Sequence, residues 1–310
     1  MENKGLKDLY ENITKVITGN ETAIKMMITC MISGGHVLVE DVPGTGKTTM
    51  AKALSKSIDA DIKRIQFTPD LLPGDIVGIN IFDKNKGEFR FVKGPVFTDI
   101  LLADEINRAA PRTQSGLLEC MEEKQVSVDG ISYELSPVFF VIATQNPIES
   151  QGTFPLPEAQ SDRFMMKIPL GDPKRETLIE IMKRNSADEP ISHIAPVLQI
   201  KDIENARVES LKVFVKDCII EYIADIIMAT GRISEERPVS PRAGIHLLKC
   251  ARSYAYFEGR KFVIPDDVKA VATYVLCHRV SSSYSSSKEV KKKLEDLLET
   301  VKAPTEDFEK

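Results

Sequence analysis

Asp41-Val42-Pro43-Gly44-Thr45-Gly46-Lys47-Thr48-Thr49 is the stretch that decides the fold, and it directly follows the apolar run Val37-Leu38-Val39. A strand that leads into a glycine loop ending in Gly-Lys-Thr, with a helix after it, is typical of a nucleotide triphosphate site. We expect the backbone N–H groups of residues 44–47 to surround a phosphate at the positive end of that helix. Lys47 would reach the β- and γ-phosphates of ATP, and the Thr48 hydroxyl would be a ligand of Mg²⁺.

Asp41 is a departure from the pattern G-x-x-x-x-G-K-[ST], because it stands where the first glycine belongs. Aspartate is among the few residues that tolerate a left-handed backbone, so the turn out of the strand can still form. We expect its side chain to point away from the phosphates. The alternative is a glycine-rich turn that follows a buried strand and binds no ligand. The helices and strands predicted around the loop decide between the two.

Bulk composition is that of an ordinary globular chain. Its 310 residues can form two domains, each with its own core, and the formal net charge of −5 argues against a dedicated nucleic-acid binder. The five cysteines form no Cys-x-x-Cys pair and the four histidines are dispersed, so no metal cluster is predicted. We find neither a signal peptide nor an uncharged stretch of ~20 residues that would cross a membrane, and we expect a cytoplasmic protein.

Short apolar runs separated by helical patterns predict a parallel sheet covered on both faces, which places the first part of the chain in the α/β class. The predicted strands are residues 37–39, 62–67, 100–103 and 139–143. The predicted helices include 20–32, before the first strand, and 48–58, between the first two strands. Two hairpins are predicted within this part. One turns around residues 83–87, and the other turns at Asp129-Gly130, a strong signal for a type I′ turn.

The strand signals end near Gly171, so we predict an α/β nucleotide-binding domain over residues 1–170 and a smaller all-helical domain over residues 171–310. In the fourth predicted helix of this second domain, five apolar residues fall on one face. The predicted helices are residues 174–186, 209–230, 240–258, 265–280 and 288–301, with a flexible connector at 281–287.

Two further motifs follow predicted strands. Asp104 and Glu105 end the strand 100–103, at the sheet edge where α/β proteins bind ligands, so Asp104 could hold Mg²⁺ through water and Glu105 could polarise the attacking water. Asn146 follows the strand 139–143, and its neutral amide could hydrogen-bond the γ-phosphate and that water. In the plainer alternatives the acids form a solvated turn, and Asn146 begins a turn before Pro147.

Several longer strings of sequence resemble the MoxR family of AAA+ ATPases. Their similarity extends from the first predicted helix to about Arg279. The strings are Asp104-Glu105-Ile106-Asn107-Arg108-Ala109, Ala143-Thr144-Gln145-Asn146-Pro147, Leu156-Pro157-Glu158-Ala159-Gln160-Ser161-Asp162-Arg163-Phe164 and Ser240-Pro241-Arg242-Ala243. Two more lie before the acidic pair, Thr68-Pro69-Asp70-Leu71-Leu72-Pro73-Gly74-Asp75 and Gly94-Pro95-Val96-Phe97.

This resemblance implies an AAA+ phosphate-loop domain with a helical lid, and it implies roles for individual residues. Asn146 matches the first sensor of the family, and Arg242 matches the second sensor, which contacts the γ-phosphate from the lid. Arg163 matches the arginine finger, which enters the nucleotide site of a neighbouring subunit. The family forms rings, usually hexamers, and acts in a chaperone-like way on client proteins, often in their maturation or metal insertion. Its partners commonly carry a von Willebrand factor type A domain.

Three other interpretations stay open from the sequence alone. The same phosphate loop occurs in small-molecule kinases, although the chain shows no acceptor site, and some AAA+ relatives are nucleotide-dependent DNA-binding switches. Arg163 could also form an exposed ion pair with the adjacent Asp162, which would contribute little to stability.

Overall fold

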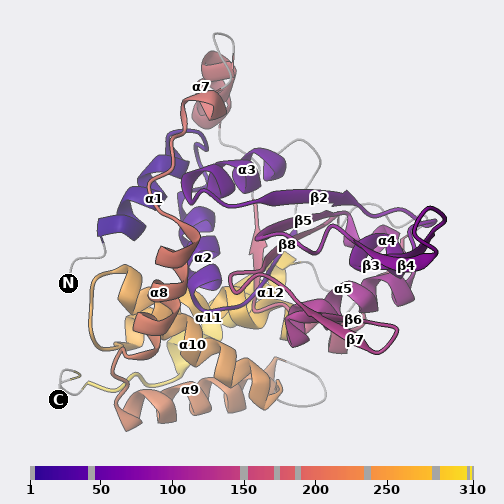
Figure 1. The fold of residues 1–310 in the computed structure, drawn as a ribbon. Coiled ribbons are helices and arrows are strands. Elements are labelled where there is room, and N and C mark those ends of the chain that lie inside the picture. The colour runs from indigo at the N-terminus through magenta and orange to yellow at the C-terminus, as the bar shows by residue number, and fades with distance from the viewer. Residues whose placement is uncertain are drawn as a thin grey trace.

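The computed structural model describes residues 4–40, 46–146, 153–170, 175–185, 190–233, 239–280, 287–305 and 308. Its centre is a five-stranded sheet in the order β2-β5-β8-β1-β9 (Figure 1). The strands are β1 (Val37–Glu40), β2 (Ile62–Gln66), β5 (Ile100–Asp104), β8 (Phe140–Gln145) and β9 (Met166–Pro169). Every neighbouring pair is parallel, so the carboxyl ends of all five strands lie along one edge. The predicted parallel sheet is confirmed.

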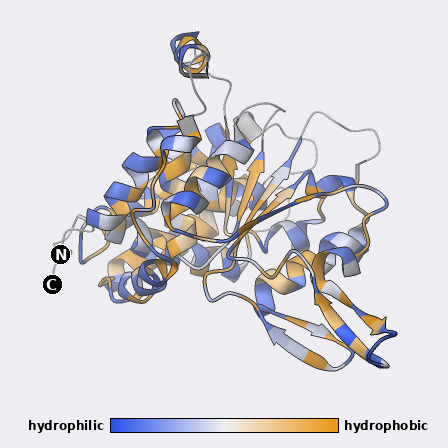
Figure 2. Ribbon diagram, turned by 45° about the horizontal axis from the view of Figure 1, so that its top comes forward, coloured by the Kyte–Doolittle hydropathy of each residue, from blue (hydrophilic) through white to orange (hydrophobic). Residues whose placement is uncertain are grey.

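Successive residues of the central strands enter two separate hydrophobic cores, one on each face of the sheet. In β5, Leu102 belongs to the first core and Leu101 to the second. The first core also takes residues from α1 (Lys4–Thr14), α2 (Glu21–Ile32) and α3 (Lys47–Ser57), and the second takes residues from α4 (Pro73–Val77) and α5 (Pro111–Glu123). Figure 2 shows the central strands in the colours of hydrophobic residues. Helices therefore cover both faces, as the uninterrupted apolar strands predict.

The edge strand β9 was not predicted. Met166-Lys167-Ile168-Pro169 is short, carries a charge and ends in proline, so it shows no apolar run. An edge position tolerates all three features, because one side of an edge strand needs no hydrogen-bonding partner. β9 pairs with β1 from Val37↔Met166 to Glu40↔Pro169. The Lys167 ammonium also forms an ion pair of 2.8 Å with Glu40.

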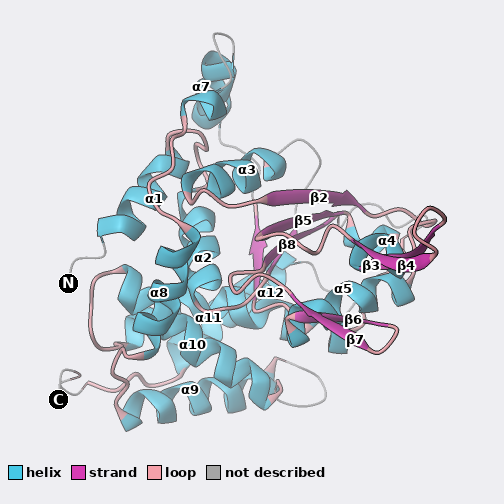
Figure 3. Ribbon diagram, in the orientation of Figure 1, coloured by secondary structure: helices cyan, strands magenta, loops and turns pink. Residues whose placement is uncertain are grey.

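Two antiparallel hairpins project beside the sheet and belong to separate two-stranded sheets (Figure 3). The first joins β3 (Gly78–Asp83) to β4 (Glu88–Lys93), and the second joins β6 (Gln125–Val128) to β7 (Ile131–Glu134). Asp129 and Gly130 both have positive φ, 51° and 80°, as a type I′ turn requires. The hairpins touch each other, with the rings of Phe91 and Tyr133 stacked at 4.3 Å and Asn80 Nδ2 donating to Asp129 Oδ2 at 2.6 Å. Both predicted hairpins are confirmed.

The chain after residue 170 is helical and shares the first hydrophobic core with the sheet. The five apolar residues predicted to share a face of α11 are all fully buried: Val268, Val271, Ala272, Val275 and Leu276. None of the helices that the structure describes combines the length and the apolar character needed to span a bilayer. The elements here are α7 (Arg175–Asn185), η2 (Pro190–His193), α8 (Ile200–Leu211), α9 (Asp217–Ala229), η3 (Thr230–Arg232), α10 (Pro241–Phe257), α11 (Pro265–Val280) and α12 (Ser287–Thr300).

The predicted helix over residues 209–230 is confirmed only from residue 217 on, because residues 209–211 end α8 and a break separates them from α9. The break between them is held by tertiary hydrogen bonds: the backbone N–H of Phe214 donates to Lys261 O, and Val263 N–H donates to Phe214 O. Helical propensity along residues 209–230 could not reveal a partner about 50 residues away. Neither α1 nor the start of α8 was predicted. Residues 281–286 of the predicted connector lie outside the described residues, and Ser287 begins α12.

Candidate nucleotide-binding site

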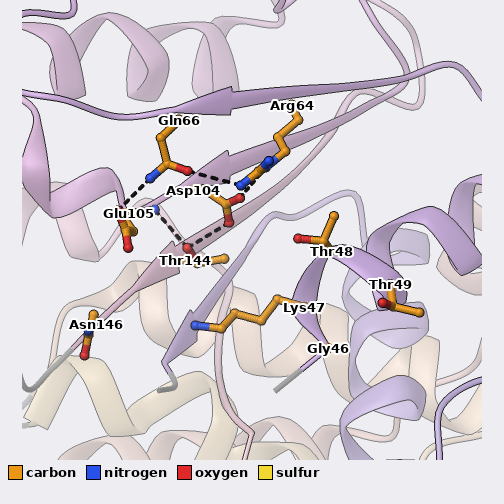
Figure 4. A pocket seen from close by; sticks show the side chains of 10 residues that line it. All are labelled: Gly46, Lys47, Thr48, Thr49, Arg64, Gln66, Asp104, Glu105, Thr144 and Asn146. Carbon is orange, nitrogen blue, oxygen red and sulfur yellow. Dashed lines mark hydrogen bonds and ion pairs between the residues drawn. The ribbon is translucent and has the colours of Figure 1, made fainter. Parts of the chain in front are cut away.

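A cavity of about 380 Å³ opens at the carboxyl edge of the sheet, between α3 and the ends of β2, β5 and β8 (Figure 4). Open α/β sheets bind ligands at this edge, outside the carboxyl ends of their strands. The residues that line the cavity are Gly46, Lys47, Thr48, Thr49, Arg64, Gln66, Asp104, Glu105, Thr144 and Asn146. The topology thus brings together the phosphate loop, the acidic pair and Asn146, which are spread over about 100 residues of the sequence.

The phosphate loop reaches this cavity through its last residues. Residues 41–45, which include Asp41, Val42, Pro43, Gly44 and Thr45, lie outside the described part of the chain. Gly46 has φ 87°, a left-handed conformation that suits glycine, and its carbonyl accepts the Met50 N–H at 2.8 Å as the first bond of α3. Lys47 and Thr48 form the first turn of α3 and line the cavity. The N–H groups at this end of α3 therefore face the cavity with positive character.

The acidic pair occupies the opposite wall. Asp104 is the last residue of β5, and Glu105 has φ 55°, a left-handed conformation that is uncommon outside glycine. Successive residues of a regular strand point to opposite faces, so the left-handed turn is what lets both carboxylates line one cavity. The Thr144 hydroxyl joins the two residues, because it accepts the Glu105 N–H at 2.9 Å and donates to Asp104 Oδ1 at 3.2 Å.

Two side chains of β2, Arg64 and Gln66, hold the acids from the neighbouring strand. Arg64 Nε donates to Asp104 Oδ2 at 2.6 Å, and Gln66 Nε2 donates to Glu105 Oε2 at 2.6 Å. Arg108 Nε lies 3.0 Å from the same Glu105 oxygen. The roles of Arg64, Gln66 and Thr144 were not predicted from the sequence. Alternation along β2 places Arg64 and Gln66 on one face, but only the strand order shows that this face borders the acids.

The side chains present fit a magnesium ion bound together with a triphosphate. Magnesium prefers oxygen ligands and usually takes one or two carboxylates, with phosphates and water completing its shell. The Asp104 carboxylate and the Thr48 hydroxyl, both in the cavity wall, are such ligands. A cage made entirely of protein ligands is not expected, and the described residues contain no cluster of three histidine, cysteine or acidic side chains suited to a metal.

Arg163 and Arg242 lie elsewhere and are not among the described residues that line the cavity. Both bind the same carboxylate, that of Glu122 near the end of α5. Arg163 Nη1 lies 2.6 Å from Glu122 Oε2 and donates to Leu118 O at 3.2 Å, while Arg242 Nη2 lies 3.0 Å from Glu122 Oε1. Arg163 pairs with Glu122 and not with Asp162, so the alternative ion pair considered from the sequence is wrong.

The topology explains why these arginines are far from their own cavity. Arg163 comes shortly before β9 begins at Met166, and α5 returns from the carboxyl edge to the amino edge of the sheet. β9 pairs with β1 over four residues, so the two edges are about 10 Å apart along the strands alone, at ~3.3 Å per residue. The Arg163 side chain is 35% exposed, so it remains accessible to another chain.

A buried arginine, Arg279, holds the segment around Arg163 in place. Arg279 Nε binds Asp162 Oδ1 at 2.6 Å, and Arg279 Nη2 donates to Phe164 O at 2.8 Å. Only 3% of the Arg279 side chain is exposed, and burial lowers its pKa although Asp162 acts in the opposite direction. Burial also lowers the pKa of His246 to about 3, so its neutral ring can accept a hydrogen bond of 2.8 Å from Arg279. This buried network holds the segment that carries Arg163.

Comparison with known protein families gives two matches. Residues 36–166 match the ATPase family associated with various cellular activities (AAA), and residues 233–300 match the AAA lid domain. Fold and site together thus define an AAA-type ATPase with a helical lid.

Relatives narrow the assignment. The chain is 38% identical over 284 residues to Chaperone MoxR1 of Mycobacterium tuberculosis, covering 88% of this chain and 75% of the relative. It is 45% identical over 271 residues to the uncharacterised protein YeaC of Bacillus subtilis, covering 87% of this chain and 85% of that one. The chain belongs to the MoxR family of AAA+ ATPases, as the resemblance in its sequence indicated.

A solved structure agrees with the fold. The crystal structure of a protein from Cytophaga hutchinsonii, described as a candidate ATPase, matches with a TM-score of 0.87 and 38% identity over 97% of this chain and 96% of that chain. The comparisons favour neither a small-molecule kinase nor a DNA-binding switch.

Proposed function

We propose that this chain hydrolyses ATP in the cavity at the carboxyl edge of the sheet. The observation that carries the proposal is the meeting of Lys47, Thr48, Asp104, Glu105 and Asn146 around one cavity. Catalysis of phosphoryl transfer to water depends chiefly on positioning and on neutralising charge at the γ-phosphate. Residues of this cavity supply groups for both tasks.

Each residue then has a defined part. The N–H groups of the phosphate loop, residues 41–49, and the Lys47 ammonium would bind the phosphates. Thr48 and Asp104 would hold Mg²⁺, the latter through water, and the ion would neutralise charge on the triphosphate. Glu105 would accept a proton from the attacking water, and Asn146 would orient that water and the γ-phosphate.

The cavity is incomplete within one chain. Among the described residues of the wall, two cations, Lys47 and Arg64, face two acids, Asp104 and Glu105, so these four charges sum to zero before a polyanion binds. Arg163 and Arg242 sit together beside Glu122, at the opposite edge of the sheet. We propose that both act on the nucleotide of a neighbouring copy, with Arg163 as the arginine finger and Arg242 as the second sensor. This requires a head-to-tail contact between copies, and a ring, usually a hexamer in this family, meets that requirement.

We further propose that the energy of hydrolysis is used to remodel or activate client proteins. The relative from Mycobacterium tuberculosis carries the name chaperone. In this proposal residues 1–170 form the nucleotide-binding domain, residues 171–310 form the lid, and the protein works in the cytoplasm. Partners with a von Willebrand factor type A domain and a client that undergoes maturation or metal insertion are part of the same proposal.

The direct test compares wild type with Glu105→Gln. This variant keeps the size and shape of the side chain, but its amide cannot accept a proton from water. We expect it to bind a fluorescent ATP analogue with Mg²⁺ as wild type does, and to release phosphate at least ~10²-fold more slowly, the usual effect of losing a general base. Unchanged phosphate release by purified Glu105→Gln would refute the assignment. Phosphate transferred to a metabolite, instead of released, would favour a kinase.

A further inference from the structure

The bond between Arg64 and Asp104 places a cation where the proposed function places a metal. Arg64 Nε lies 2.6 Å from Asp104 Oδ2, while the other oxygen, Oδ1, accepts the Thr144 hydroxyl at 3.2 Å. The two partners differ in freedom, because 56% of the Arg64 side chain is exposed but only 11% of the Asp104 side chain. Asp104 is therefore fixed in the wall, and Arg64 can turn out into solvent.

Arg64 also reaches the second acid, through Gln66. These two residues lie two positions apart on β2 and so share a face of the strand. Arg64 Nη2 donates to Gln66 Oε1 at 3.2 Å, and Gln66 Nε2 donates to Glu105 Oε2 at 2.6 Å (Figure 4). A guanidinium group has donors only, so it can face only the oxygen end of an amide. Arg64 thereby orients Gln66 with its NH₂ group toward the Glu105 carboxylate.

We propose that Arg64 is a positioning residue: it occupies the Asp104 carboxylate and orients Gln66 until Mg²⁺ arrives, and it then yields Asp104 to the metal. Before nucleotide arrives, Arg64 neutralises Asp104, and through Gln66 it keeps Glu105 engaged in a hydrogen bond. An exposed ion pair is weak, so the arrival of Mg²⁺ with ATP displaces Arg64 at little cost. Gln66 then loses the group that orients its amide, while Arg108 Nε, 3.0 Å from the same Glu105 oxygen, is not displaced. This inference rests on the proposed function, since it assumes that Mg²⁺ and ATP bind in this cavity.

The linkage predicts two opposite changes when Arg64 is removed. Without metal, Arg64 offsets the repulsion between Asp104 and the phosphates, so Arg64→Gln should weaken ATP binding. With metal present, Arg64 competes for Asp104, so the same variant should need less Mg²⁺. A residue that only supported the fold would change both quantities in the same direction, toward weaker binding.

The experiment measures the Kd of a fluorescent, non-hydrolysable ATP analogue in EDTA, and then the Mg²⁺ concentration that gives half of the metal-dependent gain in affinity. Wild type is compared with Arg64→Gln and with Arg90→Gln, the same substitution at an exposed residue of β4 outside the cavity lining. We expect Arg64→Gln to raise the Kd in EDTA and to lower the half-saturating Mg²⁺ concentration, each by about two- to fivefold, the effect of an exposed ion pair. Arg90→Gln should match wild type in both.

A second readout is structural. In a crystal structure of wild type with Mg²⁺ and the analogue, Arg64 Nε should lie more than about 4 Å from both Asp104 oxygens, beyond the range of an ion pair. Retention of the bond beside bound metal would overturn the inference, as would an unchanged or higher Mg²⁺ requirement in Arg64→Gln. Those results leave the proposed function intact. If wild type fails to bind the analogue at all, both the proposed function and this inference are wrong.

Discussion

Arg163 lies far from the cavity of its own chain, and this position predicts how much ATPase activity an assembly should have when it mixes two inactive variants. Arg163→Ala retains Glu105 but lacks the cation at the opposite edge, and Glu105→Gln retains Arg163 but lacks the base. An arginine finger contributes a factor of ~10³ or more in related systems, so each variant alone should show less than about 1% of wild-type turnover. Nucleotide binding by the isolated chains should be normal in both, because Arg163 binds Glu122 outside the cavity.

Mixing the two variants should restore activity. A site is complete when its own chain supplies Glu105 and the adjacent chain supplies Arg163. In a random one-to-one mixture each condition is met in half of the cases, so about one quarter of the sites should be complete. The assay is phosphate release after subunit exchange at saturating ATP, with fluorescently labelled copies to show that mixed assemblies form. The matched control mixes Arg163→Ala with the double variant Glu105→Gln, Arg163→Ala, and it should remain inactive.

The outcome that refutes this reasoning is simple to recognise. If labelled copies exchange but the mixture is no more active than the mean of the two separate variants, Arg163 does not complete a neighbour's site. An Arg163→Ala chain that binds nucleotide poorly before assembly would point the same way, since it would place Arg163 at its own cavity.

Two further predictions follow from the ion pairs and the buried histidines. Glu122→Gln removes the charge that holds Arg163 and Arg242 together, so turnover should fall roughly two- to fivefold, as expected for exposed ion pairs, with no change in the Kd of isolated chains for ATP. The control is Glu119→Gln, on the same helix and paired with neither arginine in the described part of the chain. A change in that Kd would contradict the position of the two arginines outside their own cavity. Burial lowers the pKa of His36 from 6.5 to about 3, so between these values the unfolded chain binds the proton and the folded chain does not. The stabilising contribution of neutral His36 is therefore complete above pH 6.5 and is lost as the pH falls, by roughly 1 kcal/mol for each pH unit below 6.5. Urea unfolding at pH 7.5 and 5.5 measures the loss. Burial also lowers the pKa values of His246 and His278, which add losses of their own, so His36→Gln should lose less stability than wild type by the share of one histidine. An equal loss in that variant would show that His36 does not contribute.

Those parts of the fold that follow from local pattern could be predicted from the sequence. The strand ending at Asp104 is marked by the apolar residues Ile100-Leu101-Leu102-Ala103, and both faces of it are buried. The hairpin at Asp129-Gly130 is marked by two residues that accept positive φ. In each case the residues that give the signal are also the ones that form the structure, so no distant partner is needed.

Features that depend on which elements are neighbours could not be predicted. β9 is recognisable only through its pairing with β1, and the break between α8 and α9 depends on the backbone near Lys261. The same limit applies to the site. Arg64 lies 40 residues from Asp104, and nothing in the sequence says that β2 borders β5. The family resemblance supplied Arg163 and Arg242, but their common partner Glu122 depends on the return path of α5.

Burial divides the arginines around this sheet into two kinds. Arg279 is almost fully enclosed and bound to Asp162, and removing one partner of such a buried pair would leave an uncompensated charge. Arg64, Arg163 and Arg242 are at least one-third exposed; Arg64 is held by Asp104, Arg163 by Glu122, and Arg242 by Glu122 and Asp162. Bonds of that kind contribute little to stability and are readily exchanged for a more highly charged partner such as a triphosphate. The three exposed arginines are therefore suited to change partners during a nucleotide cycle, while the buried one keeps the segment around Arg163 in place.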